Sequence, residues 1–339
     1  MSQPVALVTG ASGEMGHLLL PALKHRGYDI VALDLAPLEP AQSAQCVETV
    51  AASILDGGVL GELFRRHRPE IVFHLAAVLS TKAEKDPDLA FDVNTLGTVA
   101  LFRLCREEAL ARGSSVRFFF PSSIAVYGLP DARAKEAAGA LSESDWNCPA
   151  GMYGINKLYC EMLGSYFTRR AIERQEPGID FRAIRFPGLV SAETLPSGGT
   201  SDYAPEMIHA AAQGKPYACF VRADTRLPFM TMPDAVDALL LLTFTDAAAL
   251  TTRAYNIGAF SPSAAEIRAA VIEPFPGADI GFEPVAARQA IVDTWPANVD
   301  DRRARVDWGH SPRHGLREAV HDYLVPALLK RYGDHATSR

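Results

Sequence analysis

The chain has 339 residues, 48% hydrophobic and 22% charged, a composition typical of a globular protein with a large buried core rather than a disordered chain. Its formal net charge of −7 argues against the clustered basic surface that binds nucleic acid. The sequence contains no apolar run of about 18 residues and no CxxC pair among its five cysteines, so we expect a cytoplasmic protein without a secretory leader, a membrane span, a metal site or disulfides.

Short apolar runs alternate with helical patterns through the first half of the chain. The predicted strands are Val5–Thr9, Asp29–Asp34, Ile71–Leu75 and Val116–Pro121. The predicted helices between them are His17–Arg26, Gly58–His67 and Asp88–Ala111. This alternation is the pattern of βαβ units, and it predicts an α/β protein with a parallel sheet.

A glycine-rich turn follows the first predicted strand and precedes the first helix. It reads Thr9-Gly10-Ala11-Ser12-Gly13-Glu14-Met15-Gly16. We expect Gly10 to permit a tight turn, Gly13 to let the backbone approach a pyrophosphate, and Gly16 to let helix and strand pack closely. The order of strand, glycine turn and helix therefore predicts a dinucleotide site.

Asp34 ends the second predicted strand and refines the cofactor prediction. A carboxylate at this place accepts hydrogen bonds from the adenosine ribose hydroxyls and repels a 2′-phosphate. No arginine follows it, since the next residue is Leu35. We therefore expect NAD rather than NADP, and the alternative is that Asp34 only caps the turn that follows.

Tyr153 and Lys157 are spaced to lie on one face of a helix and form a candidate proton-transfer pair. A free phenol has a pKa near ~10, and a nearby ammonium is expected to lower it toward a useful range. Ser122 and Ser123 follow the strand Val116–Pro121 at the sheet edge where open α/β folds bind ligands. We expect Ser123 to bond the reacting oxygen and Ser122 to satisfy backbone groups at the strand end.

The second half of the chain is less regular. Phe181–Phe186 is predicted to be a strand, and Ser191–Ala204 is a long polar loop of the kind that often carries function. From Pro205 onward, short elements are separated by turns that contain proline. We expect these residues to form a smaller lobe that supplies contacts to the substrate.

Several of these features together resemble the extended short-chain dehydrogenase/reductase superfamily, which includes nucleotide-sugar epimerases. The features are the glycine turn, His74-Leu75-Ala76-Ala77, Asn94, Ser122-Ser123 with Tyr127-Gly128, and Tyr153 with Lys157. The resemblance implies a Rossmann-type doubly wound parallel sheet, bound NAD, and a catalytic set of Ser123, Tyr153 and Lys157. The cofactor contacts that it implies are Gly10, Gly13, Glu14, Met15, Gly16, Asp34, Ser53, Ile54, Leu75, Ala76, Ala77, Asn94, Tyr153, Lys157 and Pro187.

The second half resembles the short-chain type of L-threonine 3-dehydrogenase. The matching runs include Arg185–Ser191, Gly198–Ala204, Tyr255–Ile257 and Asp293–Pro296. The resemblance implies substrate contacts from Ser80, Ser123, Tyr153, Gly188, Thr200, Ser201, Asp202 and Trp295. The chain departs from the family at Ser201, where a second threonine is usual, and at Ser53, where an acidic residue usually meets the adenine.

The resemblance implies NAD-dependent oxidation of the 3-hydroxyl of L-threonine to 2-amino-3-oxobutyrate, with Tyr153 as general base. We expect residues 1–190 to bind NAD and residues 191–330 to bind mainly substrate, with some segments of the second range returning to the first domain. We also expect the protein to form a homodimer. The alternatives are a nucleotide-sugar epimerase or dehydratase, a dehydrogenase of another small 3-hydroxy acid, and a non-catalytic NAD-binding protein. Ser191–Ala204 contains no Arg or Lys, which favours a small amino acid over a sugar diphosphate.

Overall fold

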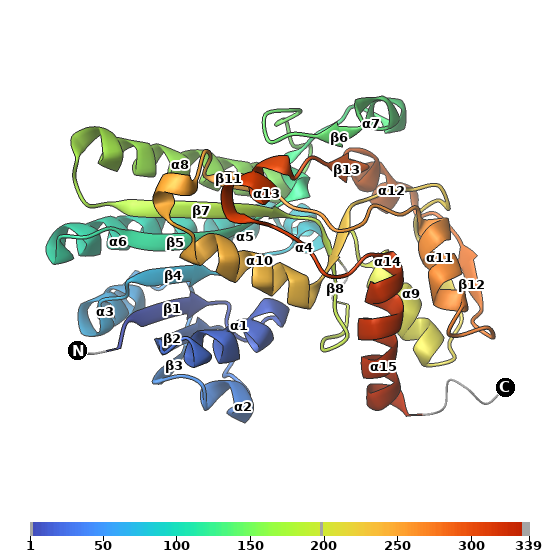
Figure 1. Ribbon diagram of the computed structural model, residues 1–339, viewed down its shortest axis with the longest axis horizontal. Helices are drawn as coiled ribbons and strands as arrows, with labels where there is room; N and C mark the ends of the chain where they lie inside the picture. Colours follow the sequence, from blue (N-terminus) through green and yellow to red (C-terminus); the bar gives the residue numbers. More distant parts are fainter. Residues whose placement is uncertain (1–2, 197–198, 334–339) are drawn as a thin grey trace. The chain divides into compact units, whose positions relative to one another are not determined.

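A computed structural model describes residues 3–196 and 199–333 of the protein, and Figure 1 shows its elements. The described chain divides into two compact units, each assembled from separate segments. The first unit contains residues 3–123, 152–185 and 239–255. The second contains residues 124–151, 186–196, 199–238 and 256–333. The roles expected for residues 1–190 and 191–330 remain predictions. Residues 124–151 belong to the second unit although they precede residue 191, and residues 239–255 belong to the first unit although they follow residue 190.

The first unit is built on a seven-stranded sheet with the strand order β11-β7-β5-β4-β1-β2-β3. The neighbouring pairs from β5 to β3 are all parallel. The strands are β1 (Val5–Thr9), β2 (Asp29–Asp34), β3 (Glu48–Ala51), β4 (Ile71–His74), β5 (Val116–Ser123), β7 (Ile179–Phe186) and β11 (Ala254–Asn256). β1 and β2 have the bounds predicted from the sequence. The sequence did not predict the edge strands β3 and β11.

Helices cover the sheet of the first unit. They are α1 (Glu14–His25), α2 (Pro40–Ser43), α3 (Gly57–His67), α4 (Ser80–Lys85), α5 (Pro87–Phe91), η1 (Asp92–Gly97), α6 (Thr98–Arg112), α8 (Met152–Arg174) and η3 (Ala247–Ala249), while α10 (Met232–Phe244) runs from the second unit into the first. α6 packs against β5 and α8, and α3 packs against α6. Phe102 of α6 packs against both Phe118 and Phe181 of the sheet, with ring centroids 4.8 and 5.8 Å away.

The core explains why the sheet strands read as continuous apolar runs. Leu7 packs in the cluster with α3 and α6, while its neighbours Ala6 and Val8 are also fully buried. Because successive side chains of a strand point to opposite faces, both faces of this sheet are covered. The protein is therefore a Rossmann-type α/β fold, as the sequence predicts.

The segment Asp88–Ala111, predicted as one helix, contains a change of helix type. The residues 92–97 of η1 form a π-helical stretch between α5 and α6. Such stretches are rare, and they occur frequently at functional sites. Asn94 lies within it and is buried.

The second unit is irregular, as predicted from its prolines. Its strands form three parallel pairs: β8 (Gly188–Val190) with β10 (Phe229–Thr231), β9 (Tyr217–Cys219) with β12 (Ile280–Phe282), and β6 (Ala140–Leu141) with β13 (Asn298–Val299). Its helices are η2 (Ile124–Val126), α7 (Ala132–Ala138), α9 (Tyr203–Ala212), α11 (Ala264–Ile272), α12 (Ala286–Asp293), α13 (Arg302–Trp308), α14 (Leu316–Glu318), η4 (Ala319–Leu324) and α15 (Val325–Tyr332). α9 packs against both α11 and α15. Among the described residues of both units, no helix is both long and apolar enough to span a membrane.

Candidate functional site

The glycine turn joins β1 to α1 at the carboxyl edge of the sheet. Gly10 has a φ of +70°, and a side chain there would overlap the backbone of Leu75 and Ala76. A side chain at Gly16 would overlap the carbonyl of Ala11. These two glycines therefore permit the turn and its close packing, as the sequence predicts.

Gly13 has the surroundings that an approaching phosphate needs. It is exposed and forms the N-cap of α1, so that Glu14 and Met15 begin the helix. A Cβ built on Gly13 would meet only the Gly10 carbonyl, at 3.3 Å, among the described atoms. The positive end of the α1 dipole and this open approach fit the pyrophosphate of a dinucleotide.

The Asp34 carboxylate is tied to the glycine turn. Its Oδ2 accepts a hydrogen bond of 2.9 Å from the Ser12 backbone, and its Oδ1 accepts one of 2.7 Å from the Leu35 backbone. The second bond is the local turn contact that we considered as an alternative. Because each carboxylate oxygen has a further lone pair, Asp34 can still accept bonds from ribose hydroxyls.

The residues expected near the adenine have local partners. Ser53 Oγ accepts a bond of 3.1 Å from the Leu55 backbone. Ile54 is buried and packs near Gly97 of η1. Their contact with the adenine remains a prediction.

The run His74–Ala77 enters the site at the end of β4. Leu75, Ala76 and Ala77 are half-buried, whereas His74 is buried. His74 lies between Thr9 Oγ1 at 2.7 Å and Thr98 Oγ1 at 2.9 Å, and Thr98 itself donates to the Asn94 carbonyl. Because the Thr98 proton is used in that bond, His74 donates through Nε2 and accepts from Thr9 through Nδ1. Burial lowers the pKa of His74 to about 3, so the ring is neutral.

Asn94 holds the backbone that follows this run. Its Oδ1 accepts from the Val78 N–H at 2.7 Å, and its Nδ2 donates to the Val78 carbonyl at 2.9 Å. These bonds fix the start of the segment that leads to Ser80, the first residue of α4. The structure thus gives Asn94 a supporting role, and a direct cofactor contact remains a prediction.

Ser123, Tyr153 and Lys157 come together where β5 ends and α8 begins. The Ser123 side chain forms a hydrogen bond with the Tyr153 phenol. Lys157 Nζ donates a bond of 2.6 Å to the Pro121 carbonyl and lies 5.5 Å from the centroid of the Tyr153 ring. Two separate parts of the sequence therefore meet as the resemblance implies.

The prediction that Lys157 lowers the pKa of Tyr153 was wrong. Burial raises the pKa of Tyr153 to about 12, and the hydrogen bond with Ser123 offsets this rise only in part. The Lys157 ammonium is directed to the Pro121 carbonyl, and burial lowers its own pKa to about 8. Tyr153 is therefore a protonated phenol at neutral pH.

Sequence reasoning missed two charged residues beside this set, Glu161 and Arg185. Glu161 lies one helical turn after Lys157, and Arg185 lies near the end of β7. They form a buried ion pair, with Arg185 Nη2 2.7 Å from Glu161 Oε2. The Ser122 hydroxyl donates to the same carboxylate, so Ser122 bonds a side chain rather than the strand-end backbone groups that we expected. The available signal was that Glu161 follows Lys157 by four residues, the same spacing that separates Lys157 from Tyr153.

A third missed residue is Glu84 of α4. Its Oε1 accepts a hydrogen bond of 2.6 Å from the N–H of Met152, which is the first residue of α8. A carboxylate at this end stabilises the helix dipole. Glu84 thus fixes the start of the helix that carries Tyr153.

The remaining expected residues belong to the second unit. Pro187, Gly188, Thr200 and Trp295 are buried there, while Ser201 and Asp202 are half-buried. A Cβ at Gly188 would lie 3.1 Å from the Ser201 Cβ, so these two residues are neighbours. Asp202 occupies the N-cap position of α9, but its carboxylate accepts from the Gly199 N–H at 2.6 Å instead of capping the helix. Ser197 and Gly198 of the predicted loop lie outside the described residues.

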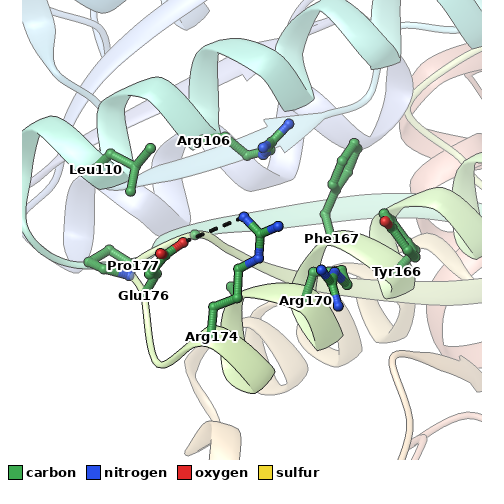
Figure 2. Close-up of a pocket in the computed structure, with 10 residues that line it drawn as sticks. Arg106, Leu110, Tyr166, Phe167, Arg170, Arg174, Glu176 and Pro177 are labelled. Carbon is green, nitrogen blue, oxygen red and sulfur yellow. Dashed lines mark ion pairs between the residues drawn. The ribbon is translucent and has the colours of Figure 1, made fainter.

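One surface hollow of the first unit lies away from the candidate site. Figure 2 shows this hollow of about 270 Å³, with Arg106, Phe167, Arg170 and Arg174 among the residues that line it. Gly178, also in its lining, accepts from the N–H of Val116, the first residue of β5. The hollow is therefore at the amino end of β5, whereas the candidate site is at the carboxyl end.

Comparisons with known proteins identify the family of the chain. A model of the NAD dependent epimerase/dehydratase family matches residues 6–258. The chain is 32% identical to the mitochondrial L-threonine 3-dehydrogenase of Sus scrofa over 336 residues, 99% of this chain and 84% of that protein. It is also 32% identical to an uncharacterized epimerase/dehydratase of Staphylococcus haemolyticus over 313 residues, 91% of this chain and 93% of that one.

A solved structure extends the comparison to the fold. A monomeric L-threonine 3-dehydrogenase from a metagenome aligns with a TM-score of 0.84 and 33% identity, covering 96% of this chain and 99% of that one. The glycine turn, Asp34 and the Ser123, Tyr153 and Lys157 cluster fit the cofactor and chemistry of this family. The chain therefore belongs to the NAD dependent epimerase/dehydratase family and is an NAD-dependent oxidoreductase that acts on CH–OH groups.

Proposed function

We propose that the protein oxidises the 3-hydroxyl of L-threonine to 2-amino-3-oxobutyrate. The observation that carries this proposal is the cluster of Ser123, Tyr153 and Lys157 at the carboxyl edge of the sheet. The cluster lies in a chain that is similar over nearly its whole length to L-threonine 3-dehydrogenases. Such a cluster handles the proton of an alcohol while the carbon beside it loses a hydride.

In this proposal the 3-hydroxyl of the substrate lies between Ser123 and Tyr153. The phenolate of Tyr153 accepts the hydroxyl proton, the C3–H bond breaks, and a carbon–oxygen double bond forms. NAD, when bound, would supply the acceptor for the hydride from C3. The Lys157 ammonium, held by the Pro121 carbonyl, lies beside the reacting groups, and the Ser123 hydroxyl donates to the reacting oxygen. Since the pKa of Tyr153 is about 12, oxidation is favoured by high pH.

We assign the cofactor contacts to the residues that the resemblance implies. The turn of Gly10, Gly13 and Gly16 with the start of α1 holds the pyrophosphate, and Asp34 holds the adenosine ribose. The other proposed contacts are Glu14, Met15, Ser53, Ile54, Leu75, Ala76, Ala77, Asn94, Tyr153, Lys157 and Pro187. The overlap that side chains would cause at Gly10 and Gly16 supports the assignment of the turn.

We assign recognition of the amino acid to polar side chains, one glycine and the Trp295 ring. The proposed contacts are Ser80, Ser123, Tyr153, Gly188, Thr200, Ser201, Asp202 and Trp295. The loop of Thr200 to Asp202 is held by the Asp202 bond to Gly199 and by Arg288, which donates to the Gly199 carbonyl at 2.8 Å. A loop fixed by its own bonds is suited to recognition of a small ligand.

The competing function is a nucleotide-sugar epimerase or dehydratase. The similarity to an uncharacterized epimerase/dehydratase supports this candidate. The absence of Arg and Lys from residues 191–204 argues against a diphosphate ligand. The test is NADH absorbance after mixing the protein and NAD with L-threonine, L-serine, D-threonine or UDP-glucose. We expect NADH with L-threonine above the comparators, and no NADH with any amino acid would overturn the proposal.

We also propose that the protein is a cytoplasmic homodimer. Ile155, Tyr159, Met162 and Tyr166 recur at helical spacing on α8 and are between 45% and 67% exposed. An apolar stripe of this kind is typical of a helix that a second copy covers. Sedimentation of the wild type and Met162→Glu tests this. A wild-type monomer, the state named for the metagenomic relative, would contradict the dimer.

A further inference from the structure

The end of β5 is bonded to α8 at three consecutive positions. The Pro121 carbonyl accepts from Lys157, the Ser122 hydroxyl donates to Glu161, and the Ser123 side chain bonds with Tyr153. The three helix residues are spaced by four, so they form one stripe along α8. Ser122 lies between Pro121 and Ser123, whose partners Lys157 and Tyr153 are assigned to the reaction. The Ser122 hydroxyl therefore links the strand end to Glu161.

Glu161 is held in turn by the neighbouring strand. Arg185 Nε lies 3.0 and 3.1 Å from the two carboxylate oxygens, and Arg185 Nη2 lies 2.7 Å from Oε2. Both residues are 3% exposed. Burial of two charges carries a desolvation penalty, and apolar residues of similar volume often replace such pairs without loss of stability. Stability alone therefore does not account for the pair.

We propose that Glu161, fixed by Arg185, is a positioning residue that sets the placement of Ser123 and Lys157 for proton transfer. Glu161 acts through the Ser122 hydroxyl, which fixes the strand end carrying both the Pro121 carbonyl and Ser123. This inference rests on the proposed function, because it assumes that Ser123, Tyr153 and Lys157 carry the reaction.

Glu161 also contributes charge near Lys157. Tyr153, Cys160 and Glu161 face the ammonium from its own helix, and His74 faces it from β4. The Glu161 carboxylate raises the pKa of Lys157, against the larger lowering by burial. Replacing Glu161 by an uncharged residue while Arg185 remains is expected to lower the pKa of Lys157 further.

The test separates position from charge balance with the double variant Glu161→Met/Arg185→Met. It removes both charges and the acceptor of the Ser122 bond. We expect a melting temperature close to wild type, unchanged NAD affinity and a kcat lowered by about tenfold or more, since small misplacements of reacting groups slow catalysis strongly. A double variant with wild-type kcat would overturn the positioning role.

Two further variants keep the proposal testable if the double variant fails to fold. Ser122→Ala removes only the hydroxyl that links the strand to Glu161, and we expect a several-fold lower kcat with little change in KM. Glu173→Gln changes an exposed acid on the same helix, paired with Arg170, and is expected to have no effect. Equal kcat in wild type and Ser122→Ala would contradict the proposal.

A measurement without cofactor or substrate tells failure of this inference from failure of the proposed function. The ionisation of Lys157 is followed by carbon-13 NMR of its Cε, assigned with Lys157→Arg. We expect a lower pKa of Lys157 in Glu161→Gln than in the wild type and in Glu173→Gln. An unchanged pKa would overturn the coupling of Glu161 to Lys157, whereas absence of wild-type turnover with L-threonine would overturn only the substrate.

Discussion

The Lys157 ammonium donates a hydrogen bond of 2.6 Å to the Pro121 carbonyl, two residues before Ser123. This bond places the charge of Lys157 at the end of β5 rather than against the Tyr153 hydroxyl. The ammonium also lies 4.5 Å from the centroid of the Phe120 ring. The backbone of the strand therefore fixes the lysine, and the proton transfer assigned to Tyr153 takes place beside an ammonium whose position is already set.

Replacement of Tyr153 by Phe is expected to remove at least about 100-fold of the turnover, because the phenol that takes the proton is lost. NAD binding is expected to stay within a few-fold, since the ring and its packing remain. Steady-state kinetics and fluorescence titration with NAD measure the two effects. Turnover near the wild-type value would rule out Tyr153 as the base.

Replacement of Asp34 by Ala is expected to weaken the preference for NAD over NADP by about tenfold or more, because the carboxylate that repels a 2′-phosphate is gone. The ratio of kcat/KM for the two cofactors is the measurement. Asp29→Asn, at the other end of the same strand, serves as the control. If the ratio in Asp34→Ala equals that of the control, another residue sets the preference.

His74 is expected to make the protein sensitive to acid. Its folded pKa of about 3 lies below the ordinary 6.5, so the unfolded chain binds more protons between these values. The free energy of unfolding therefore falls, by up to about 1.4 kcal/mol per pH unit from this group, as the pH decreases from 6.5 toward 3. Urea unfolding of wild type and His74→Gln at several pH values checks this, and equal pH slopes would show that His74 is not responsible.

Burial of the Lys157 ammonium is expected to lower the free energy of unfolding. Its folded pKa of about 8 lies below 10.5, so the burial cost of the ammonium is fully present below pH 8 and is relieved as the pH rises toward 10.5. We expect Lys157→Met to raise the free energy of unfolding at pH 7 by up to about 3 kcal/mol, with the gain shrinking above pH 8. Denaturant unfolding at pH 7 and pH 10 measures both values. A destabilised variant at pH 7 would show that the lysine bonds outweigh its burial cost.

The sequence predicts the parts of this protein that have a local pattern. β1, β2 and the turn of Gly10, Gly13 and Gly16 follow from apolar runs and glycine spacing. β3 is short and its burial alternates, and β11 joins the sheet from residue 254, far along the chain, so neither gives a strong local signal.

The other features that the sequence did not predict depend on contacts between residues far apart in the chain. The pairing of Glu161 with Arg185 joins a helix to a strand 24 residues later, and only the packed fold brings them together. The raised pKa of Tyr153 also depends on burial, which spacing alone does not determine. Spacing correctly paired Tyr153 with Lys157 but gave the wrong direction for the pKa of the phenol.

The most direct test of the proposed chemistry uses L-threonine that carries deuterium at C3, with purified protein and NAD. Mass spectrometry of the nicotinamide product follows the label. The account predicts that deuterium appears in the reduced cofactor, with 2-amino-3-oxobutyrate or its decarboxylated product formed in equal amount, and that Tyr153→Phe forms at least about 100-fold less of both. Reduced cofactor without the label, or no reduced cofactor from L-threonine, would contradict oxidation at C3.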